Sequence, residues 1–160
     1  MKIEAIHLGP EVLELLDTEG LPVSDLGRSS SINLLGVRKS GRLIGVVGFE
    51  VYGQDGLIRS LVVAPDRRGG GIGVNLVHEA EIRALSKGVS TLYLLTMTAA
   101  SFFSRLGYAT IERVTAPESI SSTAEFQMLC PASALLMRKV LSPDGSSVNI
   151  DNEKVSQCIP

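Results

Sequence analysis

The pattern of apolar and polar positions predicts alternating strands and helices over the first 141 residues. Short apolar runs rich in β-branched and aliphatic side chains are typical of buried strands. Such runs predict strands at residues 1–8, 32–37, 43–52, 57–63, 91–96 and 108–114. Apolar residues at helical spacing predict helices that begin at Pro10 and that cover residues 72–86 and 99–106. The run at 134–141 fits either a strand or a helix.

The connections between these elements predict how the strands pair. Residues 39–42 and 54–56 carry turn-forming side chains, so three strands in a row should pair antiparallel. The strand at 57–63, the helix at 72–86 and the strand at 91–96 favour a parallel pair with a right-handed crossover. Residues 20–31 are expected to form a loop, residues 115–131 to be irregular or weakly helical, and residues 142–160 to form a polar tail.

The segment from Val62 to Gly73 has the most distinctive chemistry in the chain. Pro65 ends the preceding strand because it lacks a backbone N–H, and the next helix opens directly after a run of glycines. The first N–H groups of a helix have no partner within it and lie at the positive end of its dipole. Glycines let a ligand approach that backbone closely, and Arg68 adds a positive charge. The turn therefore predicts a site for an anion such as phosphate or pyrophosphate.

Two common phosphate-binding patterns do not match this segment. A P-loop requires a Lys directly after its last glycine, and none stands there. A dinucleotide-binding loop requires Gly or Ala at a position where its two registers give Val74 and Leu76. The pattern present is Arg68-x-x-Gly71-x-Gly73. A glycine-rich turn that binds nothing stays open as the simpler alternative.

Composition limits the other classes of function. The 160 residues carry 15 Lys and Arg against 17 Asp and Glu, for a net charge of −2. This balance, without a long basic cluster, argues against nucleic acid as a partner. No apolar run reaches the roughly 18 residues of a membrane-spanning helix. Cys130 and Cys158 match no metal or disulfide spacing, so we expect a cytoplasmic protein without a metal site.

The Arg68 pattern resembles the acetyl-coenzyme A loop of the GNAT N-acetyltransferases. A second segment is similar to that family's Asn-x-x-Ala-x-x-Leu-Tyr-x-x-x-Gly-Phe, because Ala99, Gly107 and Tyr108 match it and Thr96 replaces the Asn. The resemblance covers about residues 1–141 and implies an α/β (α+β) GNAT domain there, followed by a tail at 142–160. It implies a mixed central sheet of about six to seven strands, mostly antiparallel with one splayed parallel pair, flanked by helices.

Further segments, at 45–50, 57–61, 94–107 and 129–134, look like a GNAT subgroup associated with arsenic-resistance gene clusters. That subgroup is distantly similar to amino-acid N-acetyltransferases such as the catalytic domain of acetylglutamate synthase. The likeness implies an amino acid or an arsenic-bearing analogue as a candidate acceptor. Cys130 could be a nucleophile or an arsenical ligand, but a small buried residue is the favoured interpretation, because no His partner is evident.

The family resemblance implies acetyl-coenzyme A as the cofactor. The pyrophosphate is expected on the glycine loop, and the thioester carbonyl on a backbone N–H where the strand at 61–63 splays from the strand at 92–96. Phe103 stands where many GNAT enzymes have a Tyr that protonates the departing thiolate, so water or Thr96 would have to supply that proton. The residues expected to contact the cofactor are Leu61, Val62, Val63, Arg68, Gly69, Gly70, Gly71, Ile72, Gly73, Val74, Thr96, Ala99, Phe102 and Phe103.

Glu50 is the predicted general base. An alkyl ammonium has a pKa of about 10.4, so a proton must be removed before the amine can attack at neutral pH. The alternative is that Glu50 faces solvent at a strand edge. Arg59 interrupts an apolar strand and either pairs with Glu50 or binds an acceptor carboxylate. Ser60, Asp25 and Arg28 are weaker candidates for the acceptor pocket, since a buried hydroxyl and a solvated loop would explain them as well.

Together these features favour an enzyme that transfers an acetyl group from acetyl-coenzyme A directly to a primary amine of a small molecule. Two other functions stay open. One is a non-catalytic module that binds or senses acyl-coenzyme A, which the missing Tyr permits. The other is an N-acetyltransferase that acts on a protein or peptide. By analogy with other GNAT domains, the chain is a candidate homodimer.

Overall fold

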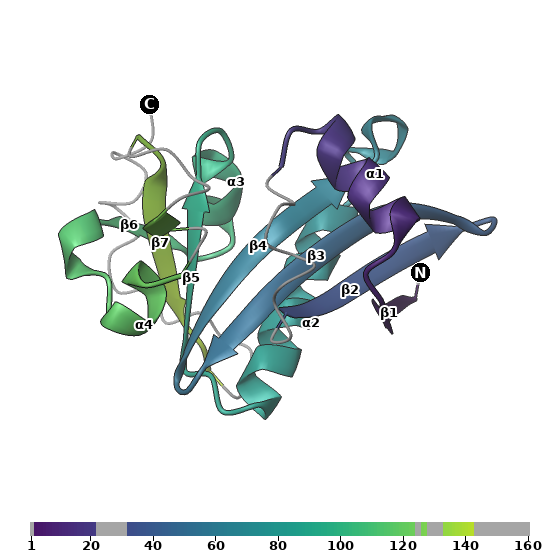
Figure 1. Ribbon diagram of the computed structural model, residues 1–160. Coiled ribbons are helices and arrows are strands. Elements are labelled where there is room, and N and C mark those ends of the chain that lie inside the picture. The colour runs from purple at the N-terminus through teal and green to yellow at the C-terminus, as the bar shows by residue number, and fades with distance from the viewer. Residues whose placement is uncertain (1, 22–31, 124–125, 128–132, 143–160) are drawn as a thin grey trace.

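The computed structural model describes residues 2–21, 32–123, 126–127 and 133–142. Within them the chain builds a seven-stranded sheet flanked by helices, with strand order β1-β2-β3-β4-β5-β7-β6 (Figure 1). Two short 3-10 turns lie at Pro65–Arg67 and Arg113–Thr115. The other elements are β1 (Ile3–Ile6), α1 (Pro10–Thr18), β2 (Ile32–Lys39), β3 (Arg42–Tyr52), β4 (Asp55–Val63), α2 (Ile72–Ser86), β5 (Thr91–Thr96), α3 (Ala100–Arg105), β6 (Ala109–Ile111), α4 (Glu118–Ser121) and β7 (Leu135–Val140).

The sheet is antiparallel except at its centre. Strands β1 to β4 pair antiparallel in chain order, as do β5 with β7 and β7 with β6. Only β4 and β5 run parallel, and α2 connects them. This arrangement confirms the expected mixed sheet with one parallel pair. The run at 134–141, for which a strand and a helix were both open, forms the strand β7, which lies between β5 and β6 in the sheet.

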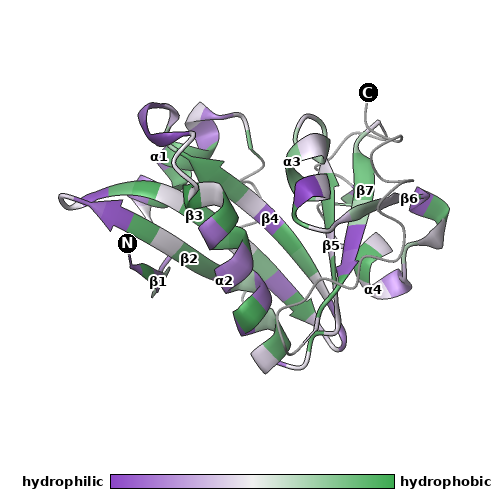
Figure 2. Ribbon diagram, turned by 180° about the vertical axis from the view of Figure 1, so that it is seen from behind, coloured by the Kyte–Doolittle hydropathy of each residue, from purple (hydrophilic) through white to green (hydrophobic). Residues whose placement is uncertain are grey.

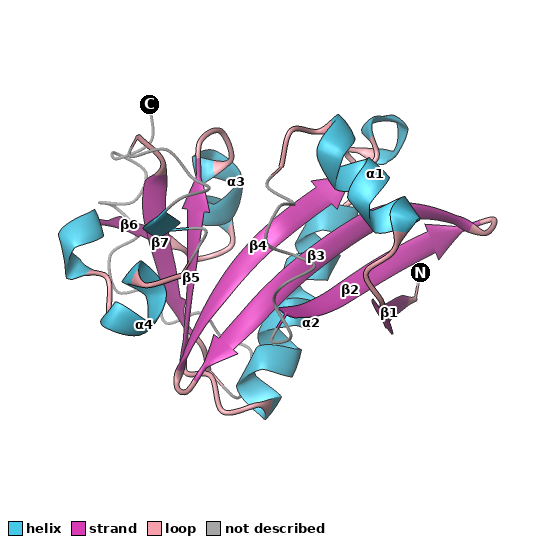
Figure 3. Ribbon diagram, viewed as in Figure 1, coloured by secondary structure: helices cyan, strands magenta, loops and turns pink. Residues whose placement is uncertain are grey.

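The parallel pair separates along its length, as Figure 3 shows. Residues 55–57 of β4 pair with residues 91–93 of β5, and no pairing follows beyond Leu57 and Tyr93. A bulge in β4 lies just past this point, because the register with β3 shifts between Val46 and Gly48. Val46 pairs with Val62 but Gly48 pairs with Arg59, so β4 carries one extra residue there. A bulge bends its strand and increases the twist, which directs β4 away from β5.

Helices cover both faces of the sheet. In Figure 1 helix α1 lies in front of the strands and α2 behind them. Val12 and Leu16 of α1 pack with Val46 and Val62 on one face. On the other face, α2 and α3 pack on alternate residues of the same strands, among them Val47. The central strands are largely hydrophobic in Figure 2, whereas the outer side of α2 carries hydrophilic residues.

Several boundaries differ from the sequence prediction. The strand expected at 1–8 covers only Ile3–Ile6, and the strand expected at 32–37 extends to Lys39. The strand expected at 108–114 is shorter, since β6 covers only Ala109–Ile111 and Val114 lies exposed in a 3-10 turn. Its apolar run reflects burial of Tyr108, which packs into the core before the strand begins. The turn expected at 54–56 lies at residues 53–54, because Asp55 already pairs with Tyr52. A two-residue hairpin loop is favoured in this setting.

No helix in the described part of the chain is long and apolar enough to cross a membrane. Among the same residues, no group of three or more His, Cys, Asp or Glu is arranged to hold a metal ion.

Candidate functional site

A cavity of about 610 Å³ lies between the end of β4, the glycine loop, the start of α2 and helix α3. We call it the loop cavity. It brings together most of the residues predicted to contact a cofactor, from three separate parts of the sequence. Those on its wall are Leu61, Val62, Val63, Arg68, Gly69, Gly71, Ile72, Gly73, Val74, Ala99 and Phe102. Its remaining lining residues, which the sequence did not single out, are Glu19, Leu21, Arg67, Arg105 and Leu106.

The glycine loop has the backbone conformation that an anion site needs. Gly69 and Gly71 have φ angles of 85° and 82°, in the left-handed region that side chains other than glycine rarely adopt. Gly71 is the N-cap of the 15-residue helix α2, and no acidic residue stands in the first turn of that helix. The first N–H groups of α2 therefore meet the cavity at the positive end of a long helix dipole.

Gly73, in the first turn of α2, lies beside α3 and the end of β4. A Cβ atom built at Gly73 would stand 3.4 Å from Cζ of Phe102 and 3.7 Å from Cγ2 of Val63. These are ordinary van der Waals distances, so Gly73 faces Phe102 and Val63, which line the cavity with it.

Arg68 is fixed at the cavity wall by two hydrogen bonds. Its Nε donates to the Val63 carbonyl at 3.0 Å, and its Nη2 donates to Oε1 of Glu19 at 2.6 Å. About half of the Arg68 side chain remains exposed, and Glu19 is the less exposed partner. The cavity thus contains a carboxylate as well as the cation that the sequence predicted.

Helix α3 supplies the apolar wall. Phe102 lines the cavity, and its ring meets Phe103 edge to face, with centroids 5.0 Å apart. Phe103 is only 5% exposed and packs against Tyr108 in the core, so it supports the wall from behind. Thr96 does not line the cavity either. Its Oγ1 accepts the Ala99 N–H at 2.9 Å, which ties the end of β5 to the start of α3.

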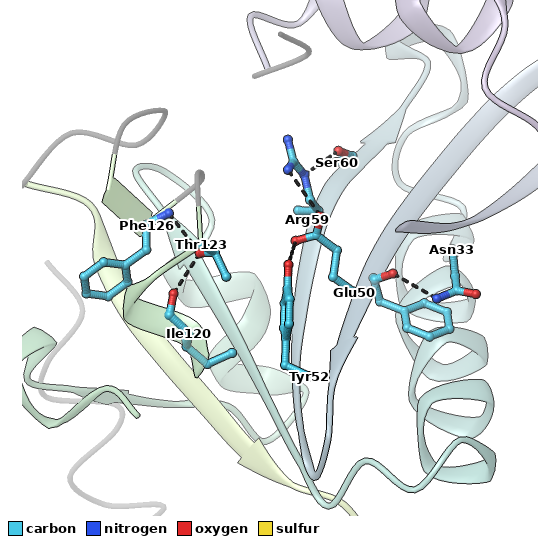
Figure 4. Close-up of polar contacts among 9 residues, drawn as sticks. Asn33, Glu50, Tyr52, Arg59, Ser60, Ile120, Thr123 and Phe126 are labelled. Atoms are coloured by element: carbon cyan, nitrogen blue, oxygen red, sulfur yellow. Dashed lines mark hydrogen bonds and ion pairs between the residues drawn. The ribbon is translucent and has the colours of Figure 1, made fainter. Parts of the chain in front are cut away.

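A buried polar cluster lies where β4 diverges from β5. We call Glu50, Tyr52, Arg59 and Ser60 the Glu50 cluster. The Tyr52 hydroxyl donates to Oε1 of Glu50 at 2.9 Å, and Nη1 of Arg59 lies 3.9 Å from Oε2 of Glu50 (Figure 4). Arg59 Nε also donates to the Ser60 hydroxyl at 3.4 Å.

The strand register explains how these side chains meet. Glu50 pairs with Leu57, so Arg59, two residues further along β4, lies on the same face and on the diagonal. Arg59 itself stands opposite Gly48, which leaves room for its guanidinium. The alternative that Glu50 faces solvent is wrong, because Glu50 is 2% exposed and Arg59 4%. The predicted pairing of Glu50 with Arg59 is confirmed.

The other side of the divergence carries a second set of groups. In Figure 4, Thr123 and Phe126 lie across from the Glu50 cluster, on the arm of the molecule beyond β5. The Thr123 hydroxyl donates to the Ile120 carbonyl at 2.7 Å and accepts the Phe126 N–H at 3.2 Å. Arg113 stands over the Phe126 ring at 4.5 Å, and Phe126 packs in one apolar cluster with Tyr52.

The bulge residue Ser60 joins the two regions. Its φ of 59° is unusual for a residue with a side chain, and it directly precedes Leu61 on the cavity wall. Among the described residues, the pairing of β4 with β5 ends at Leu57 and Tyr93. Asp25, Arg28 and Cys130 lie outside the described residues.

Some of the functional candidates could have been found from the sequence and some could not. Tyr52 follows Glu50 by two positions in a strand, and strand periodicity places such residues on one face. Glu19 and Arg105 carry no local signal, because only the packing of α1 and α3 brings them to the glycine loop. Gly70 lies on the outer side of the loop and lines a neighbouring cavity instead.

The sequence model of the acetyltransferase (GNAT) family matches residues 9–108, which is more than half of the chain. The chain belongs to the GNAT acetyltransferase family. Members of this family transfer an acetyl group from acetyl-coenzyme A, and the matched region contains both the glycine loop and the Glu50 cluster.

Comparison with known proteins adds relatives of two kinds. An uncharacterized N-acetyltransferase of Chlorobaculum tepidum is 37% identical over 81 residues, and the alignment spans about half of each chain, 50% of this one and 52% of the relative. Among solved structures, N-acetylglutamate synthase from Neisseria gonorrhoeae, complexed with coenzyme A and N-acetyl-glutamate, superposes with a TM-score of 0.72 at 21% identity. That match covers 88% of this chain and 35% of the synthase chain.

Two further structures superpose over nearly their full length. A Mycobacterium tuberculosis protein bound to coenzyme A gives a TM-score of 0.73 at 21% identity, covering 89% of this chain and all of that one. An aminoglycoside 6'-N-acetyltransferase complexed with coenzyme A gives 0.68 at 20% identity, covering 89% and 98%. At this level of identity the likeness establishes the GNAT fold.

Proposed function

We propose that the protein is an acetyl-coenzyme A-dependent N-acetyltransferase that acts on a primary amine of a small molecule. The observation that carries this proposal is the junction at Ser60 and Leu61. There the wall of the loop cavity, at Leu61, directly follows Ser60, a member of the cluster that contains the buried Glu50 carboxylate. In a member of an acetyltransferase family, this neighbourhood supports a donor site in the loop cavity and an acid–base role for the Glu50 cluster.

The loop cavity suits the cofactor's charged and apolar parts. The pyrophosphate would accept hydrogen bonds from the N–H groups at the start of α2, next to Gly69 and Gly71. The pantetheine arm would run along β4 at Leu61 and Val63 toward the unpaired edge. A backbone N–H on that edge would then polarise the thioester carbonyl and stabilise the developing oxyanion.

Glu50 is proposed as the base, acting directly or through a water molecule. It takes the proton of the acceptor ammonium, and the neutral nitrogen then attacks the thioester carbonyl carbon. The attacking nitrogen gives up its second proton to water, and the tetrahedral intermediate collapses with cleavage of the C–S bond, which gives the amide and the coenzyme A thiolate. The thiolate takes up one proton, from water or from Thr96, since the position of the usual Tyr is filled by Phe103 in the core.

A small acceptor that carries an anionic group fits the Glu50 cluster best. Arg59 is a buried guanidinium at the divergence, and such a group can hold a carboxylate through paired hydrogen bonds. The structural similarity to a synthase solved with N-acetyl-glutamate supports an amino acid as acceptor. The likeness of several sequence segments to the arsenic-associated GNAT subgroup adds arsenic-bearing amino acid analogues to the candidates.

The test is release of free coenzyme A thiol from acetyl-coenzyme A with a panel of amines, and identification of the products by mass spectrometry. The panel holds amino acids, their phosphonate and arsenical analogues, and short peptides. An acetylated small amine supports the proposal. Turnover on peptides alone would favour a peptide acetyltransferase, and cofactor binding with no turnover would favour a sensing module. Absence of cofactor binding would contradict the role given to the glycine loop.

A further inference from the structure

A second cavity, of about 550 Å³, lies on the outer side of the glycine loop. We call it the outer cavity. It shares Arg67, Arg68 and Ile72 with the loop cavity, so the two adjoin along the loop. Its other lining residues come from the β2–β3 hairpin and the loop itself, namely Arg38, Lys39, Ile44, Asp66 and Gly70.

The outer cavity is lined by four cationic side chains and one carboxylate. Two of the cations are already neutralised by carboxylates outside it. Arg38 donates to both oxygens of Glu11, at 2.8 and 2.9 Å. Arg68 donates to Glu19.

Lys39 and Arg67 are not neutralised in this way by a neighbouring carboxylate in the described part of the chain. No carboxylate of the described residues lies within ion-pair distance of the Lys39 ammonium. Among the described residues, Asp66 is the one carboxylate near Arg67, at 3.9 Å. Both oxygens of Asp66 already accept hydrogen bonds from Arg42, at 2.9 and 3.1 Å. In addition, the Nε atom of Arg67 is buried and has no hydrogen-bond partner. An unpaired buried donor of this kind is uncommon and is satisfied when an anion accepts from it.

Two unneutralised cations beside a glycine loop suit a ligand with a second phosphate group. Acetyl-coenzyme A carries such a group, because its ribose bears a 3'-phosphate in addition to the pyrophosphate. With the pyrophosphate on the loop, the nucleotide must continue either over Gly70 into the outer cavity or along α3 past Arg105. The first path leads to Lys39, which lines only the outer cavity, and to Arg67, which lines both cavities.

We infer that the outer cavity is the subsite for the 3'-phosphate of acetyl-coenzyme A, with Lys39 and Arg67 as its two ligating side chains. This inference rests on the proposed function. It means that the protein distinguishes coenzyme A from 3'-dephospho-coenzyme A, and that the distinction resides in the β2–β3 hairpin and the loop. Charge-assisted hydrogen bonds to a phosphate dianion give such contacts their strength.

The test is isothermal titration calorimetry with coenzyme A and with 3'-dephospho-coenzyme A, at low salt. The wild type is expected to bind coenzyme A about tenfold or more tightly than the dephospho form. Lys39 lines only the outer cavity. Lys39→Ala should therefore lower the preference for coenzyme A over the dephospho form by about three- to tenfold, while the affinity for the dephospho form stays unchanged. Arg67→Ala should weaken coenzyme A binding more than dephospho-coenzyme A binding.

Two control variants make the outcome unambiguous. Lys87→Ala removes an exposed charge at the far end of α2 and should leave the ratio as in the wild type. Arg105→Ala tests the other path. Equal affinity of the wild type for both compounds would overturn the inference while leaving the proposed function intact. The inference would also be overturned if the Lys39→Ala Arg67→Ala double variant still preferred coenzyme A over 3'-dephospho-coenzyme A while Arg105→Ala lost that preference. Binding of neither compound would overturn the proposed function, and the subsite with it.

Discussion

Arg68 and Glu19 form a 2.6 Å hydrogen-bonded ion pair inside the loop cavity, between the glycine loop and the residue that follows α1. The pair holds the Arg68 guanidinium next to the Val63 carbonyl, at the place where a pyrophosphate is proposed to bind. A carboxylate that already occupies the guanidinium competes with that phosphate. The strength of cofactor binding should therefore depend on Glu19.

Glu19→Gln is expected to tighten binding of acetyl-coenzyme A by about three- to tenfold, because it removes a negative charge from the phosphate site. The dissociation constant, measured calorimetrically, should show the largest gain at low salt, since salt screens such charges. Glu14→Gln is the matched control, because Glu14 lies on the exposed side of α1 and does not line the loop cavity. Weaker binding in Glu19→Gln would show instead that Glu19 organises Arg68 for the ligand.

Tyr52 is expected to position Glu50. Tyr52→Phe removes the hydroxyl that donates to Glu50 at 2.9 Å and should lower kcat by about three- to tenfold, with the acetyl-coenzyme A affinity unchanged. Tyr93→Phe is the control, since Tyr93 packs in the same apolar cluster but its hydroxyl makes no hydrogen bond within the described residues. Equal kcat values in Tyr52→Phe and the wild type would contradict the positioning role.

Gly56 stands where β4 and β5 are still paired, opposite Leu92. A Cβ atom there would lie 2.8 Å from Cδ2 of Leu92 and 3.1 Å from the Glu50 carbonyl oxygen. Gly56→Ala should therefore lower the free energy of unfolding by about 1–3 kcal/mol in urea titrations. Gly70→Ala, whose Cβ would meet only the Arg67 carbonyl at 3.9 Å, should stay within about 0.5 kcal/mol. Equal free energies of unfolding for the two variants would contradict the close packing described for Gly56 at the paired end of β4 and β5.

The sequence predicted the fold well because its signals are local. Apolar periodicity located the strands and helices, and glycine conformations confirm the turn at Gly69 and Gly71. The sequence could not show that Glu19 enters the loop cavity, or that Arg67 faces away from the loop cavity as well as into it. Those positions depend on how α1 and the β2–β3 hairpin pack on the loop. The strand at 108–114 was overestimated, because burial of Tyr108 in the core resembles the signal of a strand.

Tyr108 lies between α2, where it contacts Glu81, and α3, where its ring meets Phe103 edge to face. Its hydroxyl donates to Glu81 of α2 at 2.8 Å, and Glu81 also accepts from Lys139 of β7 at 3.0 Å. Burial raises the pKa of Tyr108 well above its usual value, and the Glu81 carboxylate adds to this shift. The folded protein therefore keeps the phenol proton at a pH where the unfolded chain loses it.

The sign of the pH dependence follows from linkage. The stabilisation from Tyr108 is complete below pH about 10 and is lost at up to about 1.4 kcal/mol per pH unit above it, until the folded pKa is reached. The free energy of unfolding of the wild type should fall more steeply above that pH than that of Tyr108→Phe. Parallel curves from urea unfolding between about pH 8 and pH 11 would contradict a proton retained on Tyr108.

The central claim is that acetyl transfer occurs at the divergence of β4 and β5, with Glu50 as the base. The most direct measurement is kcat for coenzyme A thiol release in Glu50→Gln, at a saturating concentration of an amine that the wild type acetylates. The dissociation constant for acetyl-coenzyme A is measured on the same variant. We predict that kcat falls by about a hundredfold or more while the dissociation constant changes by less than about twofold. An unchanged kcat in a folded variant would contradict the claim.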